Sequence, residues 1–143
     1  MPAIPFVKLS DRARVPEAAF SDDAAFDLYS AEDGVIPARG RATIGTAVAI
    51  EVPAGYCALV LPRSGLASKF GISVLNSPGV VDSGYRGEIR VVLANHSESE
   101  FVVKLGDRIA QLALMKIPEV EFIEVESLSE STRGLGGFGH TGR

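Results

Sequence analysis

The sequence predicts an all-β domain, a jelly-roll-like β-sandwich or barrel with one short helix. Apolar runs of a few residues recur along the chain, and residues that favour turns separate them. Turn formers are plentiful, with 15 glycines and 8 prolines among 143 residues, which favours many short strands over a few long helices. Only Ser64–Phe70 has a helical pattern. Short strands at this spacing are typical of a sandwich or barrel.

Each expected strand is an apolar or alternating run that a turn signal bounds. In the first half these runs are Ile4–Leu9, Ala25–Ser30, Arg41–Ile44, Ala47–Val52 and Tyr56–Leu61. In the second half they are Ile72–Leu75, Glu88–Asn95, Phe101–Leu105, Ile109–Ile117 and Glu121–Glu126. Among the turn signals are Pro53-Ala54-Gly55, Ser77-Pro78-Gly79 and Gly106-Asp107.

The chain is expected to form a single β domain over residues 1–126, followed by a flexible glycine-rich arm over residues 127–143. In the domain, some strands are apolar on both faces. Along Glu88–Asn95, for example, Ile89 and Val91 alternate with Val92 and Ala94. A two-layer sandwich normally exposes one face of each sheet to water, so two apolar faces indicate a subunit interface as well as a core.

Charge and composition exclude several classes of protein. The net charge is −4, which argues against a nucleic-acid partner, so any bound anion must occupy a local basic pocket. No apolar run is long enough to cross a membrane, and charged residues interrupt the N-terminus where a signal peptide would be apolar. The lone Cys57 is expected in the core. We expect a soluble, cytoplasmic protein, with an organelle or the nucleus left open.

Three polar residues stand where the strand pattern calls for apolar ones. Asp27 lies within Ala25–Ser30, Gln111 lies within Ile109–Ile117, and Asp82 ends an apolar run directly before a turn. A buried polar group without a partner costs about 1–3 kcal/mol, so each position needs a structural or functional reason. For any one of them alone, a turn cap or an inter-strand hydrogen bond is the simpler explanation.

Two glycine-containing segments suit an anion. In Pro62-Arg63-Ser64-Gly65, a guanidinium, a hydroxyl and free N–H groups come together before the helix, although Ser64 could equally be an ordinary helix cap. Gly134-Leu135-Gly136-Gly137-Phe138-Gly139 matches G-x-G-x-x-G, but too few residues follow it for a Rossmann helix. Such a backbone can wrap a phosphate while Phe138 covers a flat ring; the alternative is a disordered tail.

Five segments, taken in order, resemble the motifs of the trimeric deoxyuridine triphosphate nucleotidohydrolase (dUTPase) family. They cover nearly the whole chain: Ala24-Ala25-Phe26-Asp27-Leu28, Pro62-Arg63-Ser64-Gly65-Leu66-Ala67, Gly79-Val80-Val81-Asp82-Ser83-Gly84-Tyr85-Arg86-Gly87-Glu88, Gly106-Asp107-Arg108-Ile109-Ala110-Gln111-Leu112 and Arg133-Gly134-Leu135-Gly136-Gly137-Phe138-Gly139-His140-Thr141-Gly142. Each motif alone is weak, but their order and spacing are specific.

The resemblance implies a jelly-roll-like homotrimer with three active sites at subunit interfaces. The C-terminal arm of one subunit would close over a site that the others build. The implied reaction is hydrolysis of dUTP to dUMP and pyrophosphate, with Mg²⁺ on the triphosphate. It would remove dUTP from the nucleotide pool and supply dUMP for thymidylate synthesis.

The resemblance also implies a role for each matching residue. Asp82 would be the general base for the water that attacks the α-phosphorus, and Asp27 would hold Mg²⁺ through water. Gln111 would contact the α-phosphate, and the other phosphate ligands would be Arg63, Ser64 and Gly65. Asn76 would bind uracil, and Tyr85 would lie under the deoxyribose.

The same resemblance extends to the arm, where the substrate-binding residues would be Arg133, Phe138, Gly139, His140 and Thr141. Arg133 would pair with the γ-phosphate and Phe138 would stack on uracil. The sequence departs from the family pattern twice, with Ala25 in place of a glycine and His140 in place of a serine. Two alternatives to the dUTPase remain. One is a dCTP deaminase of the same fold, and the other is a non-catalytic trimer that binds nucleotides or another protein.

Overall fold

The computed structural model describes residues 2–142. Met1, the first residue of the expected β domain, and Arg143, the last residue of the expected arm, lie outside the described part. The strands in residues 2–142 are β1 (Phe6–Lys8), β2 (Phe26–Tyr29), β3 (Gly34–Ile36), β4 (Arg41–Ile50), β5 (Tyr56–Leu61), β6 (Ile72–Val74), β7 (Gly79–Val81), β8 (Glu88–Asn95), β9 (Phe101–Val103) and β10 (Arg108–Lys116). The helix in the same residues is α1 (Ser64–Phe70), as the sequence predicted.

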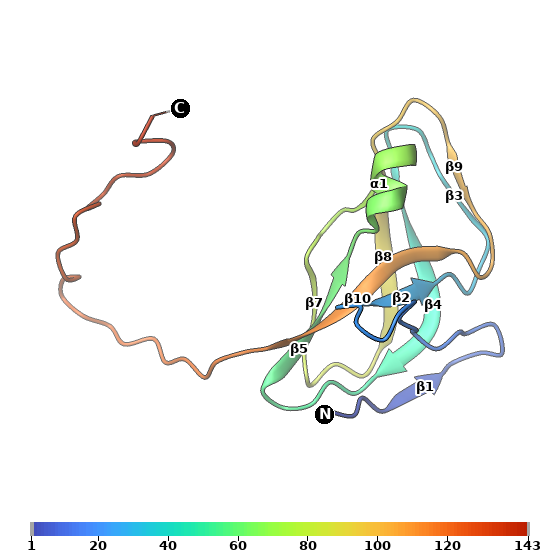
Figure 1. Cartoon of the computed structure of the whole chain (residues 1–143), viewed down its shortest axis with the longest axis horizontal. Coiled ribbons are helices and arrows are strands. Elements are labelled where there is room, and N and C mark those ends of the chain that lie inside the picture. Colours follow the sequence, from blue (N-terminus) through green and yellow to red (C-terminus); the bar gives the residue numbers. More distant parts are fainter. Residues whose placement is uncertain (1, 143) are drawn as a thin grey trace.

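Two four-stranded sheets form the body of the molecule (Figure 1). One has the strand order β1-β4-β8-β6, the other has the order β2-β10-β5-β7, and β3 and β9 make a small third sheet. Every pairing is antiparallel. Consecutive strands repeatedly cross from one sheet to the other, as in a jelly roll, so the predicted fold class is confirmed.

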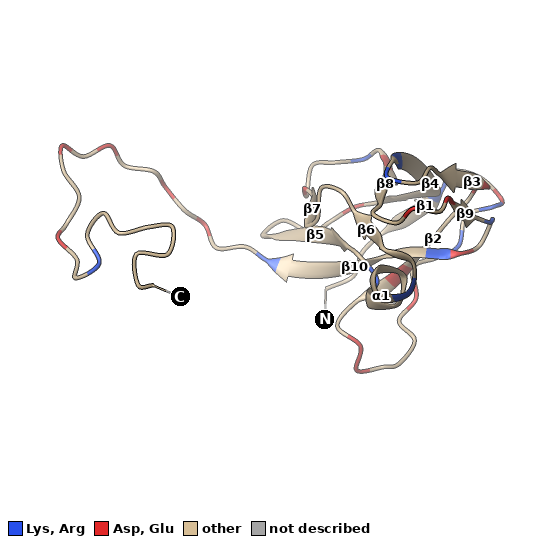
Figure 2. Ribbon diagram, turned by 90° about the horizontal axis from the view of Figure 1, so that it is seen from above, with Lys and Arg blue, Asp and Glu red and all other residues tan. Residues whose placement is uncertain are grey.

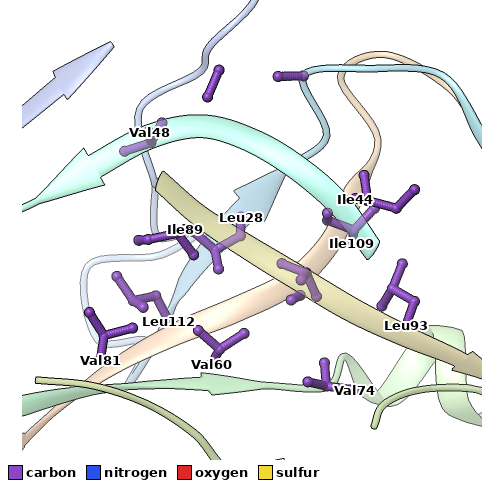
Figure 3. Packing of buried hydrophobic residues seen from close by; sticks show 14 of the residues in the cluster. Leu28, Ile44, Val48, Val60, Val74, Val81, Ile89, Leu93, Ile109 and Leu112 are labelled. Atoms are coloured by element: carbon purple, nitrogen blue, oxygen red, sulfur yellow. The ribbon is translucent and has the colours of Figure 1, made fainter. Parts of the chain in front are cut away.

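The hydrophobic core lies between the two large sheets, where their inner side chains meet (Figure 3). Val91 and Leu93 of β8 are fully buried, and Leu28 and Leu112 of the opposite sheet are nearly so. Alternation along each strand produces this arrangement, because every second side chain points inward.

The outer face of the β2-β10-β5-β7 sheet is apolar over β5 and β7, whereas its β2–β10 part carries Asp27 and Gln111. Cys57 and Leu59 of β5 point away from Ala58 and Val60, and Leu59 pairs with Val80 of β7. Val80 remains 58% exposed in the single chain. An antiparallel sheet with an uncovered apolar outer face is typical of a subunit surface.

The structure corrects several strand boundaries. Strands β3 and β7 were not predicted, because the glycines and prolines in and beside them indicate turns; both form by pairing, β3 with β9 and β7 with β5. The two runs Arg41–Ile44 and Ala47–Val52 belong to one strand, β4, whose register shifts between Gly45 and Ala49. A bulge of this kind lets the strand continue through Ala47 at φ 53°.

The predicted strand Glu121–Glu126 is wrong for the single chain. Residues 117–142 contain no strand, and they run away from the sandwich after β10 (Figure 1). Acidic residues are spaced along this segment (Figure 2), and apolar side chains lie between them, with Phe122 99% exposed. A strand needs a pairing partner, and the segment has none within its own chain.

We predict that Leu93→Ala lowers the free energy of unfolding by about 2–5 kcal/mol, because it leaves a cavity at a side chain with no solvent exposure. The control is Leu135→Ala, since Leu135 in the arm is fully exposed and its loss should change stability by less than about 0.5 kcal/mol. Denaturant melts at fixed protein concentration measure both. Equal losses for the two variants would contradict the assignment of the core.

Candidate functional site

Two polar hollows carry most of the predicted site residues, and they share no lining residue. The first, which we call the β2–β10 pocket, has a volume of about 410 Å³ and includes Asp27, Arg63, Ser64, Gly65, Arg108 and Gln111. The second, the β6–β8 pocket, has a volume of about 220 Å³ and includes Asn76, Asp82, Tyr85, Glu88 and Arg90. The chain therefore distributes these predicted residues over two separate pockets.

Asp27 is the centre of charge in the β2–β10 pocket. Its carboxylate accepts a hydrogen bond from Arg63 Nε at 3.0 Å and one from Arg108 Nη1 at 3.3 Å, and its side chain is only 15% exposed. Gln111 is its Cα partner across the β2–β10 pairing, which puts the two side chains on one face of the sheet. The polar residues on these two strands thus meet at one place.

Gln111 connects the paired strands β2 and β10 to the segment directly before helix α1. Its Nε2 donates to the carbonyl oxygen of Pro62 at 2.8 Å, directly before Arg63. A side-chain amide nitrogen carries two hydrogens, so the second one remains for a ligand. Gln111 can therefore have both roles that the sequence analysis considered, a structural hydrogen bond to a neighbouring segment and a contact with a ligand.

The start of α1 borders the same pocket. Arg63, not Ser64, occupies the N-cap position with extended backbone angles and no side-chain cap, so the interpretation of Ser64 as the cap is wrong. The Ser64 hydroxyl and the Gly65 backbone are exposed, and the first helical hydrogen bond runs from Ala67 N to Arg63 O at 3.0 Å. The N–H groups before Ala67 therefore remain free to donate.

In the β6–β8 pocket, the polar residues lie on an apolar floor. Val60, Val74 and Val91 form part of that floor. Asn76 packs against Gly79, where an added Cβ would lie 3.1 Å from Asn76 Nδ2. A hollow with an apolar floor and a carboxamide at one edge suits a flat ring with polar edges.

Asp82 and Tyr85 are the two ends of a tight turn beside that floor. Tyr85 N donates to Asp82 O at 3.1 Å, and the Tyr85 hydroxyl donates to Glu88 O at 2.9 Å. The tyrosine ring lies directly over Gly87, where an added Cβ would be 2.6 Å from Tyr85 Cζ. The Asp82 side chain is exposed at the mouth of the pocket.

The predicted arm residues lie in neither pocket. Arg133 Nε donates to Gly136 O at 2.7 Å, and the His140 imidazole lies against Gly136. Phe138 is fully exposed, with φ 44°, and Gly139 and Thr141 are exposed as well. The arm therefore forms a turn of its own, away from the site residues of its own chain (Figure 1).

Sequence reasoning missed Arg108 and Glu88 as members of the two pockets. Both belong to the quoted motifs, but neither interrupts an apolar run, so no pattern singled them out. Residues 2–142 hold no cluster of three or more metal-ligating side chains, and no helix within them is long and apolar enough to cross a membrane. The fold and the pockets define a jelly-roll-like protein with one pocket lined by cationic, amide and hydroxyl groups and a second that has an apolar floor with polar groups at its edge.

A model of the dUTPase family matches residues 11–142, so the chain belongs to that family. The deoxyuridine 5'-triphosphate nucleotidohydrolase of Nautilia profundicola is 49% identical over 136 residues, which cover 95% of this chain and 96% of the relative. The enzyme of the same name from Gloeobacter violaceus is 51% identical over 132 residues, with 90% and 88% covered.

Two solved structures extend the comparison. The dUTPase of Staphylococcus bacteriophage 80alpha, solved with dUPNHPP, has a TM-score of 0.93 and 30% identity over 100% of both chains, so the likeness includes the segment after β10. The D95N mutant of the phage phi11 dUTPase from S. aureus, described with a structural Mg(II) ion, has a TM-score of 0.82 and 28% identity. That match covers 88% of this chain and 98% of the other.

We predict that Gly87→Ala displaces the Tyr85 ring, because the new methyl group would occupy the space of the ring. The control is Gly84→Ala in the same turn, where an added Cβ meets nothing within 4 Å. The ring resonances of Tyr85 in a two-dimensional NMR spectrum report the displacement. Unchanged resonances in Gly87→Ala, or equal shifts in both variants, would contradict this packing.

Proposed function

We propose that this chain hydrolyses dUTP to dUMP and pyrophosphate, and thereby removes dUTP from the nucleotide pool and supplies dUMP. The observation that carries the proposal is that a chain of the dUTPase family has both the β2–β10 pocket, which suits an anion, and the β6–β8 pocket, which suits a flat ring. Relatives named deoxyuridine 5'-triphosphate nucleotidohydrolase align over nearly the full chain and support the same substrate.

The β6–β8 pocket would hold the nucleoside. Asn76 would supply a donor and an acceptor at the edge of the uracil ring, and the walls of the pocket would exclude an added methyl group. The Tyr85 ring is fixed by its bond to Glu88 O and by Gly87, so it offers a rigid surface beneath the deoxyribose. A rigid ring in this position would exclude the 2′-hydroxyl of a ribonucleotide by steric contact.

Asp82 would act as the general base on the attacking water. As the water oxygen forms a bond to the α-phosphorus, the bond from that phosphorus to the α,β-bridging oxygen breaks. The water proton passes to the Asp82 carboxylate, and pyrophosphate leaves with the bonding electron pair. The exposed position of Asp82 at the mouth of the pocket gives a water molecule access to it.

The β2–β10 pocket would hold the phosphates. Arg63, Ser64 and Gly65 contribute a guanidinium, a hydroxyl and free N–H groups, and Gln111 contributes its second amide hydrogen. The ion pair with Asp27 keeps the Arg63 guanidinium at the wall of the pocket. These donors would stabilise the charge that develops during phosphorus–oxygen cleavage.

Asp27 is a fitting partner for a hydrated Mg²⁺ that arrives on the triphosphate. Mg²⁺ usually keeps several waters and is held by one or two carboxylates together with substrate phosphates. Asp27 and Asp23 are the two carboxylates that line this pocket, and residues 2–142 hold no cluster of three or more metal-ligating side chains. When bound, Mg²⁺ would neutralise charge on the leaving pyrophosphate.

A homotrimer would complete the site. Within one chain the two pockets have no residue in common and the arm lies in neither, so further copies would bring a pocket of each kind and an arm together. The uncovered apolar face around Leu59 and Val80 supports such an assembly, as do the exposed apolar residues after β10. The Arg133 and Phe138 of one chain would then close over the substrate of another, with Gly139, His140 and Thr141 alongside.

The proposal is tested by product analysis with dUTP, dTTP, dCTP and UTP, each with and without Mg²⁺. We expect dUMP and pyrophosphate from dUTP alone, with faster turnover when Mg²⁺ is present. Ammonia release from dCTP would favour the deaminase instead. Tight dUTP binding without turnover would favour the non-catalytic trimer.

We predict that Asp82→Asn lowers kcat about 10²–10⁴-fold and changes KM for dUTP little, because the amide cannot take the proton but keeps the size of the side chain. The control is Asp22→Asn, which removes a carboxylate in the exposed loop before β2. Steady-state kinetics with purified variants separates the two constants. Parallel losses of affinity and rate in Asp82→Asn would make Asp82 a structural residue.

A further inference from the structure

We propose that Arg86 is a positioning residue that fixes the turn between Asp82 and Tyr85; this inference rests on the proposed function. The Arg86 guanidinium lies across the turn. Its Nη1 donates to Ser83 O at 2.7 Å and to Tyr85 O at 3.0 Å. One nitrogen thus ties together the two carbonyl groups on either side of Gly84.

The turn has little else to hold it in shape. Gly84 has no side chain, and an added Cβ there would meet nothing within 4 Å. Before the turn, β7 is held by its pairing with β5, in which Val81 lies opposite Ala58. After it, the Tyr85 hydroxyl is anchored on Glu88 O. Between these fixed points, the structure adds the Tyr85 N to Asp82 O bond and the Arg86 guanidinium.

A second contact orients the guanidinium itself. Arg86 Nη2 lies 3.3 Å from Glu51 Oε1, directly after β4, and both side chains are about half exposed at 55%. An exposed ion pair of this kind contributes little to stability. Its effect here is directional, because it holds the planar group so that Nη1 faces the two carbonyls. A lysine has no planar fork and cannot reproduce that geometry.

Fixing this turn matters because Asp82 and Tyr85 lie at its two ends. A misplacement of a catalytic group by about 1 Å can cost about 10²-fold in rate. Loss of the Arg86 bonds would let the Asp82 carboxylate swing away from the attacking water. It would also loosen the surface beneath the deoxyribose, so that discrimination between dUTP and UTP would decline.

The test is Arg86→Met, which removes every donor but keeps an unbranched stem. We expect kcat for dUTP to fall about 10- to 100-fold with KM changed less than about 3-fold, and the dUTP over UTP ratio of kcat/KM to fall as well. Arg86→Lys should recover only part of this loss. Glu51→Gln should lie close to the wild type, because the glutamine amide oxygen can still accept from Arg86 Nη2 and keep the guanidinium turned toward both carbonyls.

Arg41→Met is the matched control, since Arg41 is an exposed arginine at the start of β4. Wild-type kcat and wild-type sugar discrimination in Arg86→Met would overturn the proposal. So would a loss of activity that only follows the loss of folded, assembled protein, as measured by circular dichroism and light scattering.

A second measurement is independent of the reaction. Hydrogen exchange at the amides of Gly84 and Tyr85 should be faster in Arg86→Met than in Arg41→Met, while exchange in the core strand β8 stays unchanged. Equal exchange at the turn in the two variants would contradict the positioning role. If the wild-type chain does not hydrolyse dUTP, the proposed function fails while this exchange experiment still decides the role of Arg86.

Discussion

The pairing of β10 with both β2 and β5 is the constraint on which the candidate site depends. It puts Gln111 opposite Asp27 on one side and opposite Leu61 on the other. Since β5 ends at Leu61, the chain enters Arg63 and the helix at that same edge. The carboxylate, the amide and the guanidinium therefore converge without any contribution from a flexible loop. The same strand leads, through residues 117–126, toward the arm.

A second constraint is the division of the site. The strand β7 joins the β5 edge while β6 joins the β8 edge, so the turn between them spans the two large sheets and opens the β6–β8 pocket. The β2–β10 pocket lies instead on the outer face of the sheet, where β2 pairs with β10. Among residues 2–142, Asp82 and Asp27 line different pockets, and the exposed apolar face and the arm are surfaces through which further copies would bring such pockets together.

The sequence predicted the fold class and part of the polar lining of each pocket, but it missed Arg108 and Glu88 and did not show that the predicted residues fall into two separate pockets. Asp27 and Gln111 were detectable because polar groups on apolar strands need partners. The strands β3 and β7 were not detectable, since each begins at a glycine beside other turn-forming residues and is a strand only through its pairing. Glu121–Glu126 has a strand pattern but no partner in its own chain. The clamp of Arg86 on two carbonyls depends on turn geometry, which no residue pattern shows.

The claim that several chains share one site is tested most directly by complementation. One variant carries Asp82→Asn with an intact arm, and the other ends at Thr132 with Asp82 intact; each alone should turn over dUTP poorly. After co-refolding, the account predicts that mixed assemblies regain turnover well above the sum of the two. If mass spectrometry shows mixed assemblies and turnover stays at that sum, Asp82 and the arm serve the same chain, and the account is wrong.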